Sequence, residues 1–201
     1  METLTDNELT FNDKLHEYRL NDVVIPSVTQ VIKDAGLTNF DWIDPNLLER
    51  KADLGTKVHL TTEYYDKSIL NLDSLNPVLL EYLESWIKFR KDYEFEPTEI
   101  ELQLAHPLYR FAGTIDRIGY IKNGLVLLDI KSGTIQKVHE IQTAAYELLY
   151  NQGKKRSDQI KRRLAVYIRE DGYKVQEFKN KNDANVFLAA LTISNYKKGL
   201  K

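Results

Sequence analysis

The 201-residue chain contains no cysteine, which excludes disulfide bonds, thiolate-bound zinc, iron–sulfur clusters and a cysteine nucleophile. Any bound metal ion would need oxygen or histidine ligands. Strong net charge is also missing, since 28 basic residues stand against 30 acidic ones, for a net charge of −2. Binding to nucleic acid would therefore depend on a local basic patch, because the chain as a whole does not attract a polyanion.

Long apolar runs are absent as well, and no stretch approaches the roughly 18 residues that cross a membrane. Residues 1–6 carry acid where a secretory signal would carry base. We therefore expect a cytoplasmic protein with no membrane partner. Because no linker-like or repeated segment divides the sequence, we expect a single domain over residues 1–201. It would comprise an N-terminal extension (1–45), a helical part (46–95) and a sheet with flanking helices (96–201).

The spacing of apolar residues changes from helical to strand-like and back along the chain. The first 45 residues are expected to be largely irregular, with short extended pieces at 14–20 and 23–25. Helical patterns predict helices at 28–35, about 42–65, 77–93, 138–151 and 183–197. Extended patterns predict strands at 99–105, 110–121, 125–131, 164–168 and 173–178. This order indicates an α/β fold with a central mixed β-sheet flanked by helices.

Two acidic residues lie in apolar, strand-like segments that a tight Asn-Gly turn joins. Asp129 and Lys131 alternate with Ile130, so both should project from one face of their strand. Asp116 lies about as far from the turn on the preceding strand, and the two aspartates can be neighbours. Two adjacent carboxylates repel each other unless a cation neutralises them, and hard oxygen ligands favour Mg²⁺ or Mn²⁺. The pattern predicts a divalent metal site beside a lysine.

Other segments offer further candidates. Glu101 lies on the first predicted strand of this group, and His59 lies in the first long helix. Gln142 and Tyr146 share one face of a later helix. Ordinary roles remain open for each: a lone strand-end aspartate often forms a turn, Asp-x-Lys can be a surface ion pair, and a helix histidine or a Gln/Tyr pair can simply pack.

A local basic patch follows that later helix, with six basic residues against one intervening acid. It can contact phosphates, or it can be a solvated loop. Its members are Lys154, Lys155, Arg156, Lys161, Arg162 and Arg163.

An ordered set of short motifs resembles the PD-(D/E)XK nuclease superfamily, and within it the RecB-like exonuclease branch. The motifs are Gly113-Thr114-Ile115-Asp116, Leu128-Asp129-Ile130-Lys131-Ser132-Gly133 and Gln142-Thr143-Ala144-Ala145-Tyr146. Upstream, Gly55-x-x-x-His59 resembles the helix histidine of that branch, and Glu101 matches its preceding acid. The resemblance spans roughly residues 18–167 and extends to small phage exonucleases and the mitochondrial genome maintenance exonuclease.

The resemblance implies a restriction-endonuclease-like core and a DNA exonuclease that hydrolyses phosphodiester bonds with Mg²⁺ or Mn²⁺. It implies that the metal is held by Asp116, Asp129 and the Ile130 carbonyl, and that His59 and Glu101 complete or support this set. Lys131 would orient the attacking water and stabilise charge on the phosphate. Gln142 and Tyr146 would position the lysine or the DNA.

The implied substrate is linear DNA with a free end, in recombination, repair or DNA processing in a bacterial or phage-infected cell. A single-strand-annealing or recombination partner and a homo-oligomer are further expectations from the resemblance. Two alternatives remain: an endonuclease of the same fold, and a catalytically inactive DNA-binding or assembly protein. Asp116, Asp129 and Lys131 are all present, which argues against the inactive protein.

Overall fold

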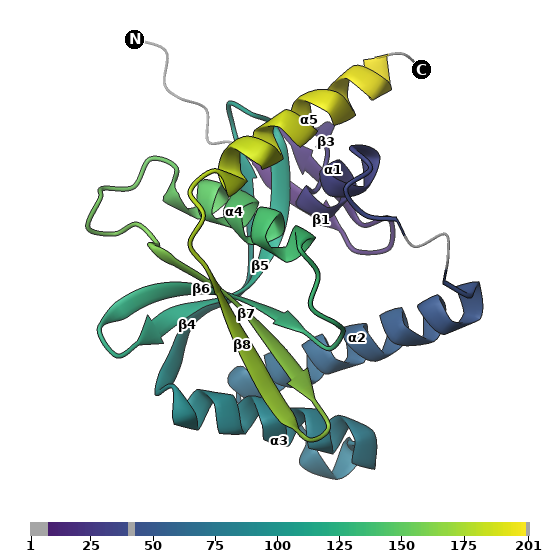
Figure 1. Ribbon diagram of the computed structural model, residues 1–201, viewed down its shortest axis with the longest axis vertical. Helices are drawn as coiled ribbons and strands as arrows, with labels where there is room; N and C mark the ends of the chain where they lie inside the picture. The colour runs from purple at the N-terminus through teal and green to yellow at the C-terminus, as the bar shows by residue number, and fades with distance from the viewer. Residues whose placement is uncertain (1–7, 40–42, 200–201) are drawn as a thin grey trace.

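The computed structural model describes residues 8–39 and 43–199, and five strands in this part of the chain form one mixed sheet (Figure 1). The neighbouring strands are antiparallel except for the parallel pair β6 and β7. In sheet order the strands are β4 (Phe95–His106), β5 (Phe111–Ile121), β6 (Gly124–Lys131), β7 (Arg162–Arg169) and β8 (Gly172–Phe178). Helix α4 (Val138–Asn151) makes the crossover that a parallel pair requires. The predicted α/β fold with a mixed sheet is confirmed.

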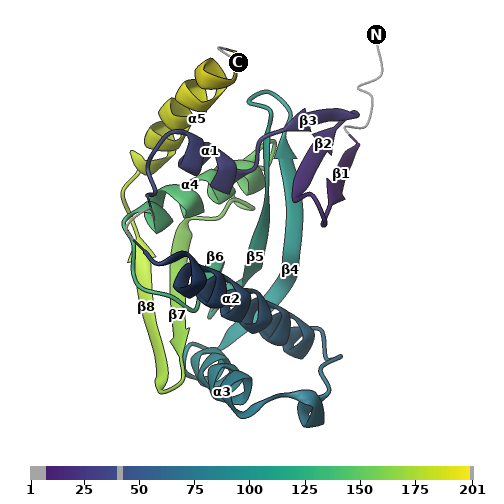
Figure 2. The ribbon, with the colours of Figure 1, turned by 90° about the vertical axis from the view of Figure 1, so that its right-hand side faces the viewer.

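The N-terminal segment forms a small antiparallel sheet of its own. It consists of β1 (Leu9–Asn12), β2 (Glu17–Leu20) and β3 (Val23–Ile25). The Ala112 amide donates a 3.0 Å hydrogen bond to the Pro26 carbonyl, which fastens this sheet to the start of β5 (Figure 2). The prediction of short extended pieces was right for β2 and β3, but β1 was not expected.

Helix boundaries follow the capping residues. Ser27 caps α1 (Val28–Asp34) through a hydrogen bond from the Gln30 amide, and the Gln30 side chain accepts from the Ser27 amide. Asp44 and Asn76 cap α2 (Pro45–Asp66) and α3 (Pro77–Asp92), each with proline in the first turn. The remaining helices are the 3₁₀ turn η1 (Leu72–Ser74) and α5 (Asp183–Gly199).

The expected helix start near residue 42 and the acidic residues 1–6 lie outside the described residues. No helix in the described ranges is both long and apolar enough to cross a membrane.

Helices cover both faces of the large sheet. The first cluster of buried apolar residues joins α1, α4 and α5 to one face, and the second joins α2 and α3 to the other (Figures 1 and 2). Along β6 the side chains alternate: Leu127 packs in the first cluster, while Leu128 and Ile130 pack in the second. Asp129 and Lys131 therefore share the Leu127 side of the strand.

The sheet forks between β5 and β6. Their pairing ends at Arg117 and Leu128, beyond which β5 pairs only with β4, and β6 only with β7. At the fork, Asp116 Oδ2 accepts a 2.6 Å hydrogen bond from the Ile130 amide. A side-chain oxygen thus binds a strand amide just beyond the point where the pairing of β5 with β6 ends. The opening lies where the two predicted aspartates meet.

Candidate active site

A cavity of about 250 Å³ opens at this fork. Its walls come from α2, β4, β5, β6 and α4, and also from the N-terminal segment. All seven side chains singled out as catalytic or metal-binding in the sequence line it: His59, Glu101, Asp116, Asp129, Lys131, Gln142 and Tyr146. The structure thus brings together residues that are up to 87 positions apart in the chain.

Three of these side chains form a group that could hold a metal ion. One ligand atom each from His59, Glu101 and Asp116 lies within 4.8 Å of the others. His59 Nδ1 is 3.6 Å from Asp116 Oδ2, and the His59 ring exposes 31% of its side-chain surface. Burial lowers the pKa of the His59 ring, and the nearby Asp116 carboxylate and the Ile130 backbone oppose this shift. Asp129 lies beside this group and not within it, because its carboxylate turns to Lys131, with 2.8 Å between Oδ2 and Nζ.

Two carboxylates of the cavity are costly to ionise, because they are buried. Burial raises the pKa of Glu101 to about 8, and the nearby charge of Asp116 adds to the rise despite the opposing effect of Arg117. Burial likewise raises the pKa of Asp129 to about 7, although Lys131 opposes it. Near neutral pH, binding a proton or a cation would stabilise each of these two carboxylates.

Lys131 and Tyr146 keep their protons in this setting. Burial lowers the pKa of Lys131, but the carboxylates of Asp129 and Asp116 outweigh it and the net pKa is raised. Burial raises the pKa of Tyr146 well above its usual value, so the phenol stays neutral. Gln142 Nε2 donates a 3.0 Å hydrogen bond to the Tyr146 hydroxyl. The cavity therefore contains a cationic amine and a neutral hydroxyl donor beside its acids.

The residues present fit a divalent cation. Asp129 Oδ2 is buried and accepts no hydrogen bond of good geometry, even though Lys131 Nζ lies close to it. This oxygen therefore has an ion-pair partner, and its remaining lone pairs are free to bind a further cation. Carboxylate oxygens with one imidazole and no thiolate suit Mg²⁺ or Mn²⁺.

The sequence did not identify the N-terminal wall of the cavity. His16, Tyr18, Ser27 and Thr29 line it, and the Tyr18 hydroxyl lies 2.6 Å from Thr114 Oγ1. No local pattern marks these side chains as site residues, because only the pairing of β2 with β3 and the docking of Pro26 on β5 bring them there.

Gly113 makes room for the Tyr146 ring. A Cβ at residue 113 would lie 2.8 Å from Tyr146 Cε1, closer than real contacts allow. Close approach of the ring explains why this strand position of the motif is glycine.

The predicted basic patch is divided. Lys154, Lys155, Arg156 and Lys161 are exposed on the loop between α4 and β7. Arg162 is half-buried and forms an ion pair with Glu177. Arg163 is buried and bound to Asp183 at 2.9 Å and Glu147 at 3.0 Å, so it is not available to DNA. This corrects the six-residue set: the four exposed residues remain the candidates for phosphate contact.

His139, on α4, makes folding stability sensitive to acid. It is 6% exposed, its Nδ1 lies 2.7 Å from the Tyr167 hydroxyl, and burial, with help from Lys131, lowers its pKa to about 4. Since an unfolded histidine has a pKa of about 6.5, the unfolded state binds the extra proton as pH falls through this window.

We therefore expect wild type to lose about 3 kcal/mol more unfolding free energy than His139→Gln between pH 7 and pH 4. Urea unfolding at several pH values measures both curves. The raised pKa values of Glu101 and Asp129 affect both proteins and cancel in the difference. Parallel curves would contradict the assignment.

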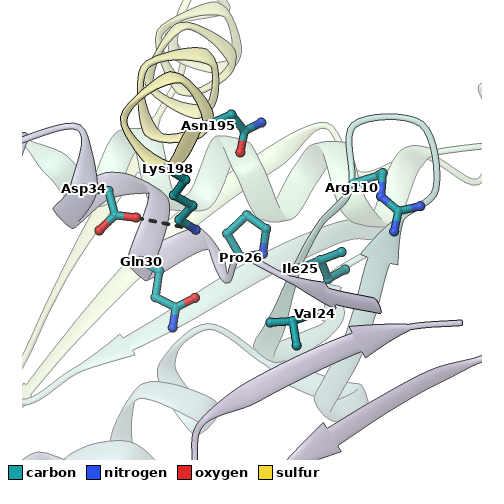
Figure 3. Close-up of a pocket in the computed structure, with 8 residues that line it drawn as sticks. All are labelled: Val24, Ile25, Pro26, Gln30, Asp34, Arg110, Asn195 and Lys198. Atoms are coloured by element: carbon teal, nitrogen blue, oxygen red, sulfur yellow. Dashed lines mark ion pairs between the residues drawn. The ribbon is translucent and has the colours of Figure 1, made fainter. Parts of the chain in front are cut away.

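A second cavity, of about 640 Å³, contains none of the predicted site residues (Figure 3). It lies where α1, α5 and β3 meet the turn before β5. Lys198 and Asp34 form an ion pair there, with 3.6 Å between Nζ and Oδ2. The larger volume thus lacks the group of acids that distinguishes the smaller cavity.

Comparison with known proteins gives one family match and similar solved structures. No curated protein matches the sequence significantly. A crystal structure of SSO0001 is similar at 14% identity and a TM-score of 0.42, covering 85% of this chain and 75% of that one. LHK-Exo in complex with dAMP is similar at 12% identity and a TM-score of 0.35, covering 88% and 93%. A family model matches residues 71–193, more than half of the sequence, and the chain belongs to the PD-(D/E)XK nuclease superfamily.

Proposed function

We propose that this nuclease is a divalent-metal-dependent DNA exonuclease of the RecB-like branch. The observation that carries the proposal is the convergence of His59, Glu101 and Asp116 with the Asp129–Lys131 pair in one cavity. Four separate elements supply these five side chains, so the fold brings them together and not their proximity in the sequence. Gly55 and His59 on α2 support the RecB-like branch.

His59, Glu101 and Asp116 would hold Mg²⁺ or Mn²⁺, with Asp129 and the Ile130 carbonyl beside them. Such an ion, when bound, lowers the pKa of a water molecule and withdraws charge from a phosphate oxygen. The protein fixes its own ligands in advance. Asp116 is held by the Ile130 amide, and Asp129 is held at the strand end by its neighbour Lys131.

Lys131 would act on the reacting phosphate. Its protonated amine donates a hydrogen bond that orients the attacking water, and its charge stabilises the negative charge that develops on the phosphoryl oxygens. Tyr146 and Gln142 stand at the same wall as neutral donors and would position the DNA backbone. No covalent nucleophile is needed.

The walls of the cavity would receive a phosphate and its neighbouring groups, because acids, a lysine and neutral donors line it. Lys154, Lys155, Arg156 and Lys161 would add salt-sensitive phosphate contacts along the strand that leads away.

We also infer that the N-terminal extension is part of the nuclease domain, because Tyr18 and Ser27 line the cavity. A role in recombination, repair or phage or bacterial DNA processing, a recombination or annealing partner, and a homo-oligomer stay predictions.

End-labelled linear DNA and covalently closed circular DNA test this function directly. With Mg²⁺ or Mn²⁺ we expect the linear DNA to be degraded from its ends and the closed circle to survive. A chelator should abolish the activity, and added metal should restore it. Cleavage of the circle would instead identify an endonuclease, and activity in the chelator would overturn the metal requirement.

A further inference from the structure

A fully buried arginine lies directly behind the candidate metal site. The side chain of Arg117, on β5, is 0% exposed and makes four hydrogen bonds. Its Nε donates to Asp66 Oδ2 at 2.7 Å, and its Nη1 donates to Glu101 Oε1 at 2.9 Å and to the Asp116 carbonyl. Nη2 reaches Thr62 Oγ1 at 3.3 Å. One guanidinium therefore links the last turn of α2 to two of the candidate ligands.

Asp66 anchors this guanidinium. Its carboxylate is 0% exposed, and its Oδ1 accepts from Trp86 Nε1 at 3.0 Å and from Arg90 Nη1 at 2.8 Å. The Arg117 guanidinium also lies over the Trp86 ring, 5.9 Å from its centroid. Asp66 is thus fixed from α3 on one side and binds Arg117 on the other, which leaves the arginine little freedom to move.

The position of Glu101 depends on contacts with its neighbours, because its backbone is strained. It has a φ of +52°, a left-handed conformation that side chains other than glycine, asparagine and aspartate rarely adopt. It lies in β4 between the pairs Ile100–Arg117 and Leu102–Ile115, opposite Asp116. Strained residues persist where surrounding contacts hold them, and such residues cluster at functional sites. Without a cation nearby, the adjacent Asp116 carboxylate would repel Glu101 out of the site.

We propose that Arg117, fixed by Asp66, is a positioning residue that holds the Glu101 carboxylate in place to bind the metal ion. This inference rests on the proposed metal site. Because the planar guanidinium forms a rigid fork, it can bind Asp66 and Glu101 at once, which the single ammonium of a lysine cannot do in the same geometry. Arg117 would thus act on the metal only through Glu101.

Calorimetric titration with Mn²⁺ tests this in the absence of DNA. Arg117→Lys keeps the charge and loses the fork, and we expect Mn²⁺ affinity to fall by about tenfold or more. Glu101→Gln should weaken binding as well, and the double variant should bind no worse than Glu101→Gln alone, since both changes remove the same interaction.

Arg163→Lys is the matched control. Arg163 is another buried arginine with two carboxylate partners, Asp183 and Glu147. Neither partner belongs to the group that could hold the metal ion. A purely structural role of Arg117 predicts that both lysine variants lower Tm and leave Mn²⁺ affinity unchanged. If Arg117→Lys does not fold, Asp66→Asn replaces it, with an expected loss of Mn²⁺ affinity of several-fold.

Each outcome is decisive. Wild-type Mn²⁺ affinity in Arg117→Lys, or in Asp66→Asn, would overturn the positioning role. If Glu101→Gln still bound Mn²⁺ more weakly than wild type, the proposed metal site would nevertheless be supported. Additive losses in the double variant would also overturn it, because Arg117 would then act by another route. Unchanged affinity in Glu101→Gln would remove Glu101 from the ligand set, and the proposed site would fail together with this inference.

Discussion

Replacing Asp116 by asparagine is expected to slow DNA hydrolysis by about 1,000-fold, the scale of losing a main electrostatic group of an active site. Asparagine has the same shape, and its Oδ1 can still accept a hydrogen bond from the Ile130 amide, so the link between β5 and β6 at the fork should persist. The substitution removes the negative charge of residue 116, which lies beside His59 and Glu101 in the group that would hold the cation. The turnover number on end-labelled linear DNA in saturating Mg²⁺ measures the effect.

Asp53→Asn serves as its control, because Asp53 is an exposed residue of α2 whose ion pair with Lys57 lies at the surface. We expect this variant to retain wild-type turnover. Excess Mn²⁺ should not restore Asp116→Asn. An Asp116→Asn protein that works within tenfold of wild type would show that the catalytic centre lies elsewhere.

Replacing Lys131 by alanine is expected to reduce turnover by about 100- to 1,000-fold while metal binding persists. The amine is the cationic donor closest to Asp129, so its removal takes away the group that stabilises charge on the phosphate. It also leaves the nearly buried Asp129 carboxylate, 1% exposed, without its counter-ion. A divalent cation would then compensate that charge, so Mn²⁺ affinity should be kept or increased. Turnover and Mn²⁺ affinity should therefore separate in this variant.

Lys57→Ala controls for the loss of a lysine from an ion pair, since the pair with Asp53 is exposed and worth little. Full activity in Lys131→Ala would reduce Asp129-x-Lys131 to an ordinary ion pair, the alternative that the sequence left open. Loss of Mn²⁺ binding together with turnover would instead make the lysine a support of the metal ligands.

The elements with a strong local signal were predictable. The helix over 138–151 agrees with α4 at both ends, and the helix predicted from residue 77 begins at Pro77 beside a side-chain cap. Alternation along 125–131 correctly put Asp129 and Lys131 on one face. Such features depend on residues close in sequence, which is why one sequence is enough to predict them.

Features that depend on the choice of partner could not be predicted. The pattern of 125–131 is the same whether its end pairs with β5 or with β7, so the fork is invisible in it. Arg163 and Lys161 are both basic letters in the sequence, and only the structure shows that Arg163 is buried against acids. Arg117 did carry a signal, a charge within a run of buried strand residues, but its partner Asp66 lies 51 positions away.

The hydrogen bond from the Ile130 amide to Asp116 connects the backbone of the sheet directly to the candidate metal site. An ion bound to this carboxylate would draw electron density from the oxygen that the amide uses. The Ile130 backbone proton is therefore a natural spectroscopic reporter, whose nuclear resonance registers occupancy without any label near the substrate path.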